Sequence, residues 1–235
     1  RSRRQRQMCI RDSDGTQQCV ITDPQGNEHK LVLPMPGRFN VANALVALAV
    51  SELAGLPIED ALAGIAHVVV PGRLQRIDEG QDYLAIVDYA HKPAAVAAVI
   101  ATLRSEIKGR LCVVLGAGGD RDASKRAIMG REAARGSDLF IVTDDNPRSE
   151  DPAVIRAAVE AGAYELPTEE RGEVRNIGDR AAAIRAAIAW AEPGDAVLVA
   201  GKGHETGQNV NGVIHHFDDR EEVRAALQER RTGSL

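Results

Sequence analysis

The chain contains few aromatic residues and few cysteines, and it has no long apolar run. Aromatic residues make up 3% of the 235 residues, although apolar residues make up 44%. We therefore expect a core built mainly from Ala, Val, Leu and Ile. No apolar run approaches the ~20 residues that a helix needs to cross a bilayer, and no secretory signal is visible. These absences predict a cytoplasmic protein with no membrane partner.

The three cysteines are too few for a disulfide framework, and their spacing is not that of a metal site. Cys112 lies within an apolar run, so we expect a core residue rather than a nucleophile. The net charge is −5, and outside the N-terminus the basic residues are scattered. The sequence therefore gives no sign of a nucleic-acid partner.

Residues 1–13 differ from the rest of the chain, with five arginines and no amphipathic period. We interpret this segment as a non-native tail and exclude it from fold prediction. Without its five arginines and one aspartate, the chain has 24 basic and 33 acidic residues. The apparent basic arm is thus no evidence for a polyanionic partner.

The next part of the chain resembles the end of a domain. Residues 17–33 predict a β-hairpin around a Pro/Gly turn. Helical patterns follow at 41–53 and 58–67, and an extended linker follows at 68–73. We assign 14–73 to this first domain.

From residue 74 onward, apolar runs alternate regularly with helical patterns. This order predicts an α/β domain over 74–235, in which a parallel sheet is covered by helices on both faces in a doubly wound, Rossmann-like arrangement. The expected strands are 84–87, 111–115, 139–142 and 196–200, and the expected helices are 94–107, 125–136, 152–162, 179–191 and 219–230.

Each expected strand ends in a polar loop. These loops are 88–91, 116–122, 144–148 and 201–205. Because the carboxyl ends of parallel strands meet at one edge of the sheet, we expect the four loops to form a ligand site.

The loop Asp144–Arg148 offers an acceptor, an amide and a guanidinium within a few residues, which suits a zwitterion with an amine and a carboxylate. An ordinary strand-to-helix turn explains the same string, with Ser149 or Asp151 as N-cap and Pro152 as the first helical residue. The string alone leaves both interpretations open.

Two glycine strings do not fit common phosphate loops. Gly116–Gly119 lacks the third glycine of a dinucleotide fingerprint, and Gly201–Glu205 has no Ser or Thr after its lysine, so it is not a Walker A loop. Glu205 is available to accept from an ammonium, whereas His204 is either an acid/base group or a helix cap. Arg126 either points toward an anionic ligand or pairs with neighbouring aspartates.

Other polar residues also allow two interpretations. Asp88 and His91 would form an acid/base pair at a strand end, but no nucleophile elbow accompanies them. Asn40 and Asn43 lie one helical turn apart, and Asn40 alone is a candidate N-cap. The histidines and aspartates of 215–219 are more typical of surface and capping residues than of a metal site.

Taken together, six strings resemble the Mur ligase family in order and spacing. They are GRFNVAN (37–43), VPGR (70–73), VDYAHKP (87–93), GAGGDRDASKR (116–126), DDNPR (144–148) and AGKGHE (200–205). The resemblance covers about residues 15–230. It is strongest to the members that add meso-diaminopimelate during peptidoglycan synthesis.

The resemblance implies an ATP-dependent acid–amino-acid ligase. In this family ATP, with Mg²⁺, phosphorylates a D-glutamyl carboxylate, and the amine of the incoming amino acid attacks the acyl phosphate. The implied partners are UDP-N-acetylmuramoyl dipeptide, meso-diaminopimelate and ATP, and we expect a monomer.

The resemblance also implies two sets of binding residues. The residues expected to bind meso-diaminopimelate are Arg126, Asp145, Asn146, Pro147, Arg148, Gly201 and Glu205, with Arg148 on the distal carboxylate. The residues expected near the nucleotide are Asn40, Asn43, Arg73, Asp88, Tyr89 and His91. No catalytic residue and no metal ligand is expected within this sequence.

The sequence departs from the family pattern at Lys92, where Thr is common, and at Ala127, where Pro is usual. More seriously, the family's P-loop, carbamylated lysine, magnesium ligands and UDP-sugar domain are missing. We therefore expect a C-terminal fragment that is inactive alone, with 14–73 from the central ATP-binding domain. Two alternatives remain, a lysine-adding Mur ligase and a non-catalytic Rossmann module; Arg148 argues against the former, because lysine has no second carboxylate.

Overall fold

The computed structural model describes residues 8–11, 17–23, 25–35 and 37–235. The chain divides into two compact units, Arg1–Val70 and Pro71–Leu235. The predicted boundary lay three residues later, after Arg73. The difference arises because Gly72 packs against the backbone of Gly203 and Arg73 lies over the ring of Tyr89, both in unit 2.

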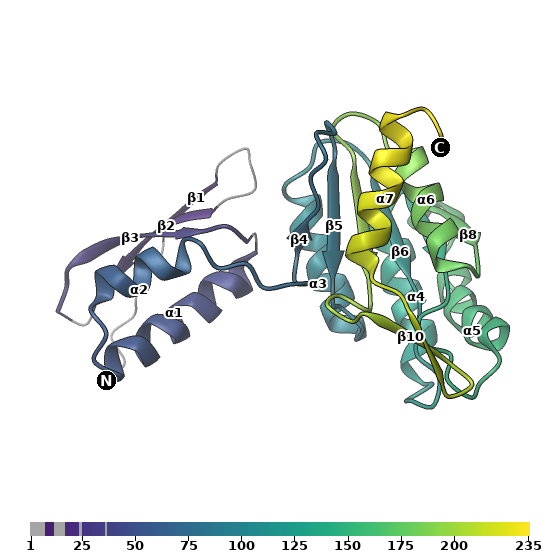
Figure 1. Ribbon diagram of the computed structural model, residues 1–235, viewed down its shortest axis with the longest axis horizontal. Coiled ribbons are helices and arrows are strands. Elements are labelled where there is room, and N and C mark those ends of the chain that lie inside the picture. The colour runs from purple at the N-terminus through teal and green to yellow at the C-terminus, as the bar shows by residue number, and fades with distance from the viewer. Residues whose placement is uncertain (1–7, 12–16, 24, 36) are drawn as a thin grey trace. The chain divides into compact units, whose positions relative to one another are not determined.

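Unit 1 contains an antiparallel sheet in the order β1-β2-β3 (Figure 1). Its strands are β1 (Met8–Arg11), β2 (Gln17–Thr22) and β3 (Glu28–Leu33). The predicted hairpin over 17–33 is thereby confirmed. The exclusion of residues 1–13 from the fold was wrong for β1, whose backbone pairs with β2.

Two helices, α1 (Arg38–Leu53) and α2 (Ile58–Ile65), pack on this sheet around buried apolar residues. The residue before α1 is Gly37, with a φ of 103° that favours glycine. The alternative that Asn40 is the N-cap is therefore wrong, because the helix begins before it. Asn40 is buried within α1, whereas Asn43 is exposed.

Unit 2 is a mixed α/β domain with a mostly parallel sheet of six strands. Its order is β4 (Gln75–Arg76), β5 (Leu84–Asp88), β9 (Ala196–Ala200), β6 (Leu111–Leu115), β7 (Leu139–Val142) and β8 (Glu173–Asn176). Only β4 runs antiparallel to its neighbour. The strands β4 and β8 were not predicted, since both are short, polar edge strands with no apolar run.

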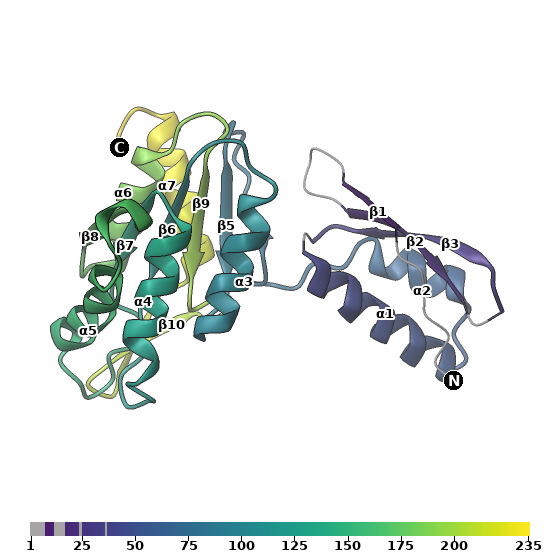
Figure 2. The same cartoon turned by 180° about the vertical axis from the view of Figure 1, so that it is seen from behind.

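Helices cover both faces of this sheet, as predicted. Figure 1 shows α6 (Arg180–Trp190) and α7 (Asp219–Arg231) on one face, and Figure 2 shows α3 (Pro93–Arg104), α4 (Lys125–Gly136) and α5 (Pro152–Tyr164) on the other. A 3-10 turn at Thr168–Glu170 follows α5. Alternate residues of β6 separate between the two cores: Leu111, Val113 and Leu115 pack toward α3 to α5, and Cys112 and Val114 toward α6 and α7.

The order of the strands creates a switch point at one edge of the sheet. The chain moves outward from β6 to β7 and β8, and then returns to place β9 on the other side of β6. Open α/β sheets bind ligands outside the carboxyl ends of the strands at such a point. The loops after β6, β7 and β9 all begin there.

A second hairpin, β10 (Gly207–Val210) and β11 (Val213–His216), was also missed. Its turn is Asn211-Gly212, both with positive φ, at 51° and 82°. Asn-Gly flanked by Val210 and Val213 is a hairpin signal, and it was present in the sequence. Within the described ranges, no helix is long and apolar enough to span a membrane.

Candidate functional site at the carboxyl edge of the sheet

The loop Asp144–Arg148 is held by the β10–β11 hairpin. Asn209 N donates to Asn146 Oδ1 at 2.9 Å, and Arg148 N donates to Asn209 O at 2.9 Å. Asn211 N in turn donates to Arg148 O at 2.7 Å. The hairpin therefore holds the loop Asp144–Arg148 through backbone hydrogen bonds of the kind that join neighbouring strands.

The same loop also serves as a strand-to-helix turn. Asp151 caps α5, since its side chain accepts from Ala153 N at 2.8 Å, and Pro152 is the first helical residue. The two interpretations of the loop are compatible, because the cap uses only residues after Arg148.

The glycine loop after β6 packs against this segment. Gly119 N donates to Asn146 O at 2.9 Å, and a Cβ on Gly119 would overlap Pro147 O. Arg148 has a positive φ of 52°, and its Nη1 donates to Gly119 O at 2.7 Å. A Cβ on Gly118 would lie 2.9 Å from the same Nη1. The glycines thus make room for the buried Pro147 and for the guanidinium of Arg148.

Two carboxylates, Asp145 and Glu205, come together from different loops. Asn146 Nδ2 donates to Asp145 Oδ1 at 2.9 Å and to Glu205 Oε2 at 3.0 Å. Gly201, with a φ of 118°, admits the other oxygen of Asp145, because a Cβ there would lie 2.8 Å from Asp145 Oδ2. Four of the predicted amino-acid-binding residues, Asp145, Asn146, Gly201 and Glu205, therefore lie together.

Arg126 is buried at the start of α4 and pairs with Glu150 at 2.8 Å. The alternative that it pairs with neighbouring aspartates is therefore wrong. Arg126 and the N–H of Asp120 hold the pKa of Glu150 below its usual range. Arg126 Nε is buried and has no hydrogen-bond partner in the described chain, which leaves one donor without a protein acceptor.

A fully buried ion pair between Arg180 and Asp219 is bonded to the backbone at the start of the loops after β7 and β9. Arg180 donates from Nε to Asp219 Oδ1 at 2.7 Å and from Nη2 to Asp219 Oδ2 at 2.8 Å. It also donates to Ala200 O at 2.9 Å and to Asp144 O at 3.3 Å. Arg180 therefore joins the end of β9, the loop after β7 and α7.

The predicted nucleotide residues of unit 2 form a second cluster. The Arg73 guanidinium lies 4.6 Å from the centre of the Tyr89 ring, and the rings of His91 and His204 lie 4.6 Å and 5.1 Å from it. The helix-cap alternative for His204 is wrong, since β10 follows it. The two remaining nucleotide candidates, Asn40 and Asn43, belong to α1 of unit 1.

Asp88 is buried, and each of its oxygens accepts a backbone N–H at 2.7 Å, from Leu74 and from Ala90. Burial raises the pKa of Asp88, and these donors and the charge of Arg73 offset part of the effect. His91 Nδ1 interacts with Tyr89 O at 2.8 Å instead. The possibility of an acid/base pair between Asp88 and His91 is therefore wrong, because neither side chain hydrogen-bonds the other.

Among the described residues, no group of three or more His, Cys, Asp or Glu side chains is arranged to hold a metal ion. Asp218 caps α7 by accepting from Arg220 N at 2.9 Å. His216 is exposed and contacts Glu221 at 2.6 Å. Cys112 is a fully buried core residue, as predicted, and burial raises the pKa of its thiol.

Comparison with known proteins identifies the family. Residues 72–203 match the family described as "Mur ligase, glutamate ligase domain". The chain therefore belongs to the Mur ligase family. It is similar to the UDP-N-acetylmuramoyl-L-alanyl-D-glutamate–2,6-diaminopimelate ligases of Corynebacterium glutamicum and Corynebacterium efficiens, with 59% identity over 223 residues and 62% over 216 residues.

The chain spans less than half the length of these relatives. The matches cover 94% and 91% of this chain but only 43% and 41% of the two ligases. A solved structure of a ligase of the same name superimposes with a TM-score of 0.66 at 38% identity, over 92% of this chain and 43% of that one. The Mycobacterium tuberculosis folylpolyglutamate synthase shares the fold, with a TM-score of 0.62 and 23% identity. This match covers 97% of the present chain and 47% of the synthase.

Several residues around the site were missed by the sequence analysis. They are Lys202, Gln208 and Asn209, which contact Asp145 or Asn146, and Arg180, which donates to Asp144 O in the same loop. The Asn-Gly turn was a signal for the hairpin that carries Gln208 and Asn209. No comparable signal marked Arg180, because only the packing of α6 against α7 places it below the site.

Proposed function

We propose that this chain is the amino-acid-binding part of an ATP-dependent amide ligase that adds meso-diaminopimelate to UDP-N-acetylmuramoyl-L-alanyl-D-glutamate in peptidoglycan biosynthesis. The names of the two corynebacterial relatives support this assignment, at 59% and 62% identity over more than nine-tenths of the chain. We further propose that the whole protein is a cytoplasmic monomer.

The observation that carries the proposal is the position of Arg148 on the same short loop as Asp145, which lies beside Glu205. A guanidinium fork binds a carboxylate through two bonds, and carboxylates accept from an ammonium. One end of diaminopimelate carries both groups on a single carbon. Lysine carries only the ammonium at that end, so Arg148 favours diaminopimelate.

The role of these residues in the reaction is to hold the amino acid for attack. ATP transfers its terminal phosphoryl group to the D-glutamyl carboxylate, the free amine attacks the resulting acyl phosphate, and phosphate leaves as the amide forms. Holding the amine close to the mixed anhydride lowers the entropic part of the barrier. Arg126, Pro147 and Gly201 complete the amino-acid site in this proposal.

In unit 2, the nucleotide is proposed to contact Arg73, Asp88, Tyr89 and His91. Asn40 and Asn43 of unit 1 are proposed as nucleotide-binding residues from their sequence string GRFNVAN alone. The ring of Tyr89 suits stacking with an aromatic base, and the guanidinium of Arg73 above that ring suits a phosphate. Magnesium would offset phosphate charge when bound. The described residues do not provide a cluster of carboxylates for it, so no step is assigned to a metal held by them.

Calorimetric titration of the 235-residue chain with meso-diaminopimelate and with L-lysine tests the proposal. We expect heat of binding with diaminopimelate, and an affinity for lysine at least tenfold weaker. Equal affinities would favour the lysine-adding alternative, and binding of neither amino acid would contradict the proposed function.

A further inference from the structure

Lys202 is a buried cation that the proposed reaction does not use. It follows β9, and its side chain has no exposed surface. Its Nζ donates to Gly207 O at 2.6 Å and lies 3.5 Å from Glu205 Oε2 and 3.8 Å from Asp145 Oδ1. A buried charge is costly unless it is paired, so both carboxylates are needed to keep this ammonium in place.

Lys202 contacts the same two oxygens that Asn146 holds. Asn146 Nδ2 donates to Asp145 Oδ1 and Glu205 Oε2, the two carboxylate oxygens that pair with Lys202 Nζ. Within the described part of the chain, the other oxygens, Asp145 Oδ2 and Glu205 Oε1, accept no hydrogen bond from the protein. Each carboxylate therefore has one oxygen fixed by protein donors and one oxygen that accepts no hydrogen bond from the described residues.

We propose that Lys202 is a positioning residue that orients the Asp145 and Glu205 carboxylates, so that their second oxygens accept the distal ammonium of the amino-acid substrate. The inference rests on the proposed function and deepens it. Lys202 does not itself contact the substrate in this proposal. Its ammonium fixes the inner oxygens, and the amide of Asn146 shares this task.

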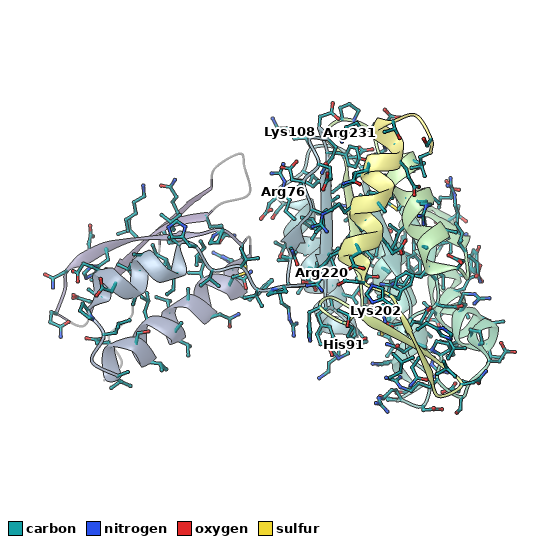
Figure 3. The ribbon with its side chains drawn as sticks, viewed as in Figure 1. Arg76, His91, Lys108, Lys202, Arg220 and Arg231 are labelled. Carbon is teal, nitrogen blue, oxygen red and sulfur yellow. The ribbon has the colours of Figure 1, made fainter. Side chains whose placement is uncertain are left out.

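The charge balance of the cluster supports the same conclusion. Asp145 and Glu205 carry two negative charges, and Lys202 neutralises one of them. Arg180 and Asp219, the charged pair below the cluster, cancel each other. One net negative charge remains, which matches one ammonium. Figure 3 labels Lys202 in the lower half of unit 2, where His91 is also labelled.

The test compares two ligands on three proteins. The ligands are meso-diaminopimelate and 2-aminopimelate, which lacks one amino group but keeps both carboxylates. The proteins are the unaltered 235-residue chain, Lys202→Gln and Lys202→Arg, each titrated by calorimetry. Glutamine keeps an N–H for Gly207 O and removes the charge, whereas arginine keeps the charge. Arg185→Gln is the control, because Arg185 pairs with Glu222 and Glu229 and contacts no residue of the cluster.

In the unaltered chain we expect diaminopimelate to bind at least tenfold more tightly than 2-aminopimelate. Lys202→Gln should reduce this ratio to about one by weakening diaminopimelate alone, while Lys202→Arg and Arg185→Gln should keep most of it. Equal losses for both ligands would indicate a purely structural role and overturn the inference, as would an unchanged ratio in Lys202→Gln.

The same data separate the inference from the function on which it rests. If the unaltered chain binds neither ligand, the proposed function fails and the inference fails with it. If the unaltered chain discriminates and Lys202→Gln does so equally, only the inference fails. Should Lys202→Gln not fold, as judged by circular dichroism, Lys202→Arg decides: retained discrimination supports the role of the charge, and loss of discrimination in a folded protein contradicts it.

Discussion

Arg180 and Asp219 form a two-point ion pair in which neither side chain has any exposed surface. The pair connects the first residue of α6 to the first residue of α7, and the same guanidinium also reaches Ala200 O and Asp144 O. Desolvation alone would lower the pKa of Arg180, but Asp219 more than offsets it, so the guanidinium remains charged. The two loops that carry Asp145 and Glu205 thus share one rigid support.

Replacing Arg180 with Met should therefore destabilise unit 2 strongly. It leaves the Asp219 charge buried without a partner, which costs about 3–5 kcal/mol of the free energy of unfolding. Arg185→Met is a matched control, because Arg185 also joins α6 to α7 but is partly exposed, and such pairs contribute about 0–1 kcal/mol. Urea unfolding of both variants measures the difference. If both variants lose the same free energy of unfolding, burial does not explain how much the pair of Arg180 and Asp219 contributes to stability.

Replacing Gly130 should destabilise unit 2, because α4 and α5 approach each other closely at this residue. A Cβ on Gly130 would overlap Val159 O, and a Cβ on Gly162 would overlap Ala127 O. Gly130→Ala should therefore lower the free energy of unfolding of unit 2 by about 1–3 kcal/mol, the usual range for overpacking. Thermal unfolding measures this loss.

Gly64 provides the control for that substitution. It also lies within a helix, α2 of unit 1, but no atom lies within 4 Å of a Cβ placed there. Gly64→Ala should stabilise unit 1 by about 0.5–1 kcal/mol, because alanine has the higher helix propensity. A stabilising effect of Gly130→Ala as well would contradict the close helix crossing.

Arg148→Ala should remove the discrimination between diaminopimelate and lysine. The affinity for diaminopimelate should fall at least tenfold, since the distal carboxylate loses a charge-assisted partner. The affinity for lysine, which has no such carboxylate, should change little. Calorimetric titration with both amino acids measures the two effects. An unchanged preference for diaminopimelate would reject Arg148 as the carboxylate ligand.

His216 should titrate above its ordinary pKa of 6.5, because its hydrogen bond to Glu221 stabilises the charged ring. A pKa raised by folding contributes stability that is present below 6.5 and is lost as the pH rises through the folded pKa. Glu221→Gln should move the NMR titration midpoint of His216 down toward 6.5. A midpoint that does not change would place the cause elsewhere.

The strongest sequence patterns predicted the fold well where burial was complete. Continuous apolar runs predicted β5, β6, β7 and β9, because strands buried on both faces need apolar residues at every position. The edge strands β4 and β8 were missed, since their residues are partly exposed and carry no such run. The strand β1 was not predicted for a different reason, because the five arginines of residues 1–13 resemble non-native sequence.

The sequence by itself determined the parallel α/β class of unit 2, the polar loops at its strand ends and the similarity to Mur ligases, because these depend on local patterns and on ordered motifs. Only the tertiary structure decided how the loops are supported. It joined Lys202 to Asp145 and Glu205, placed Arg180 on Asp219, and set Asn209 against Asn146. Asp145 and Glu205 are 60 residues apart in the chain, so the contacts between them follow from strand order and helix packing, which no local pattern encodes.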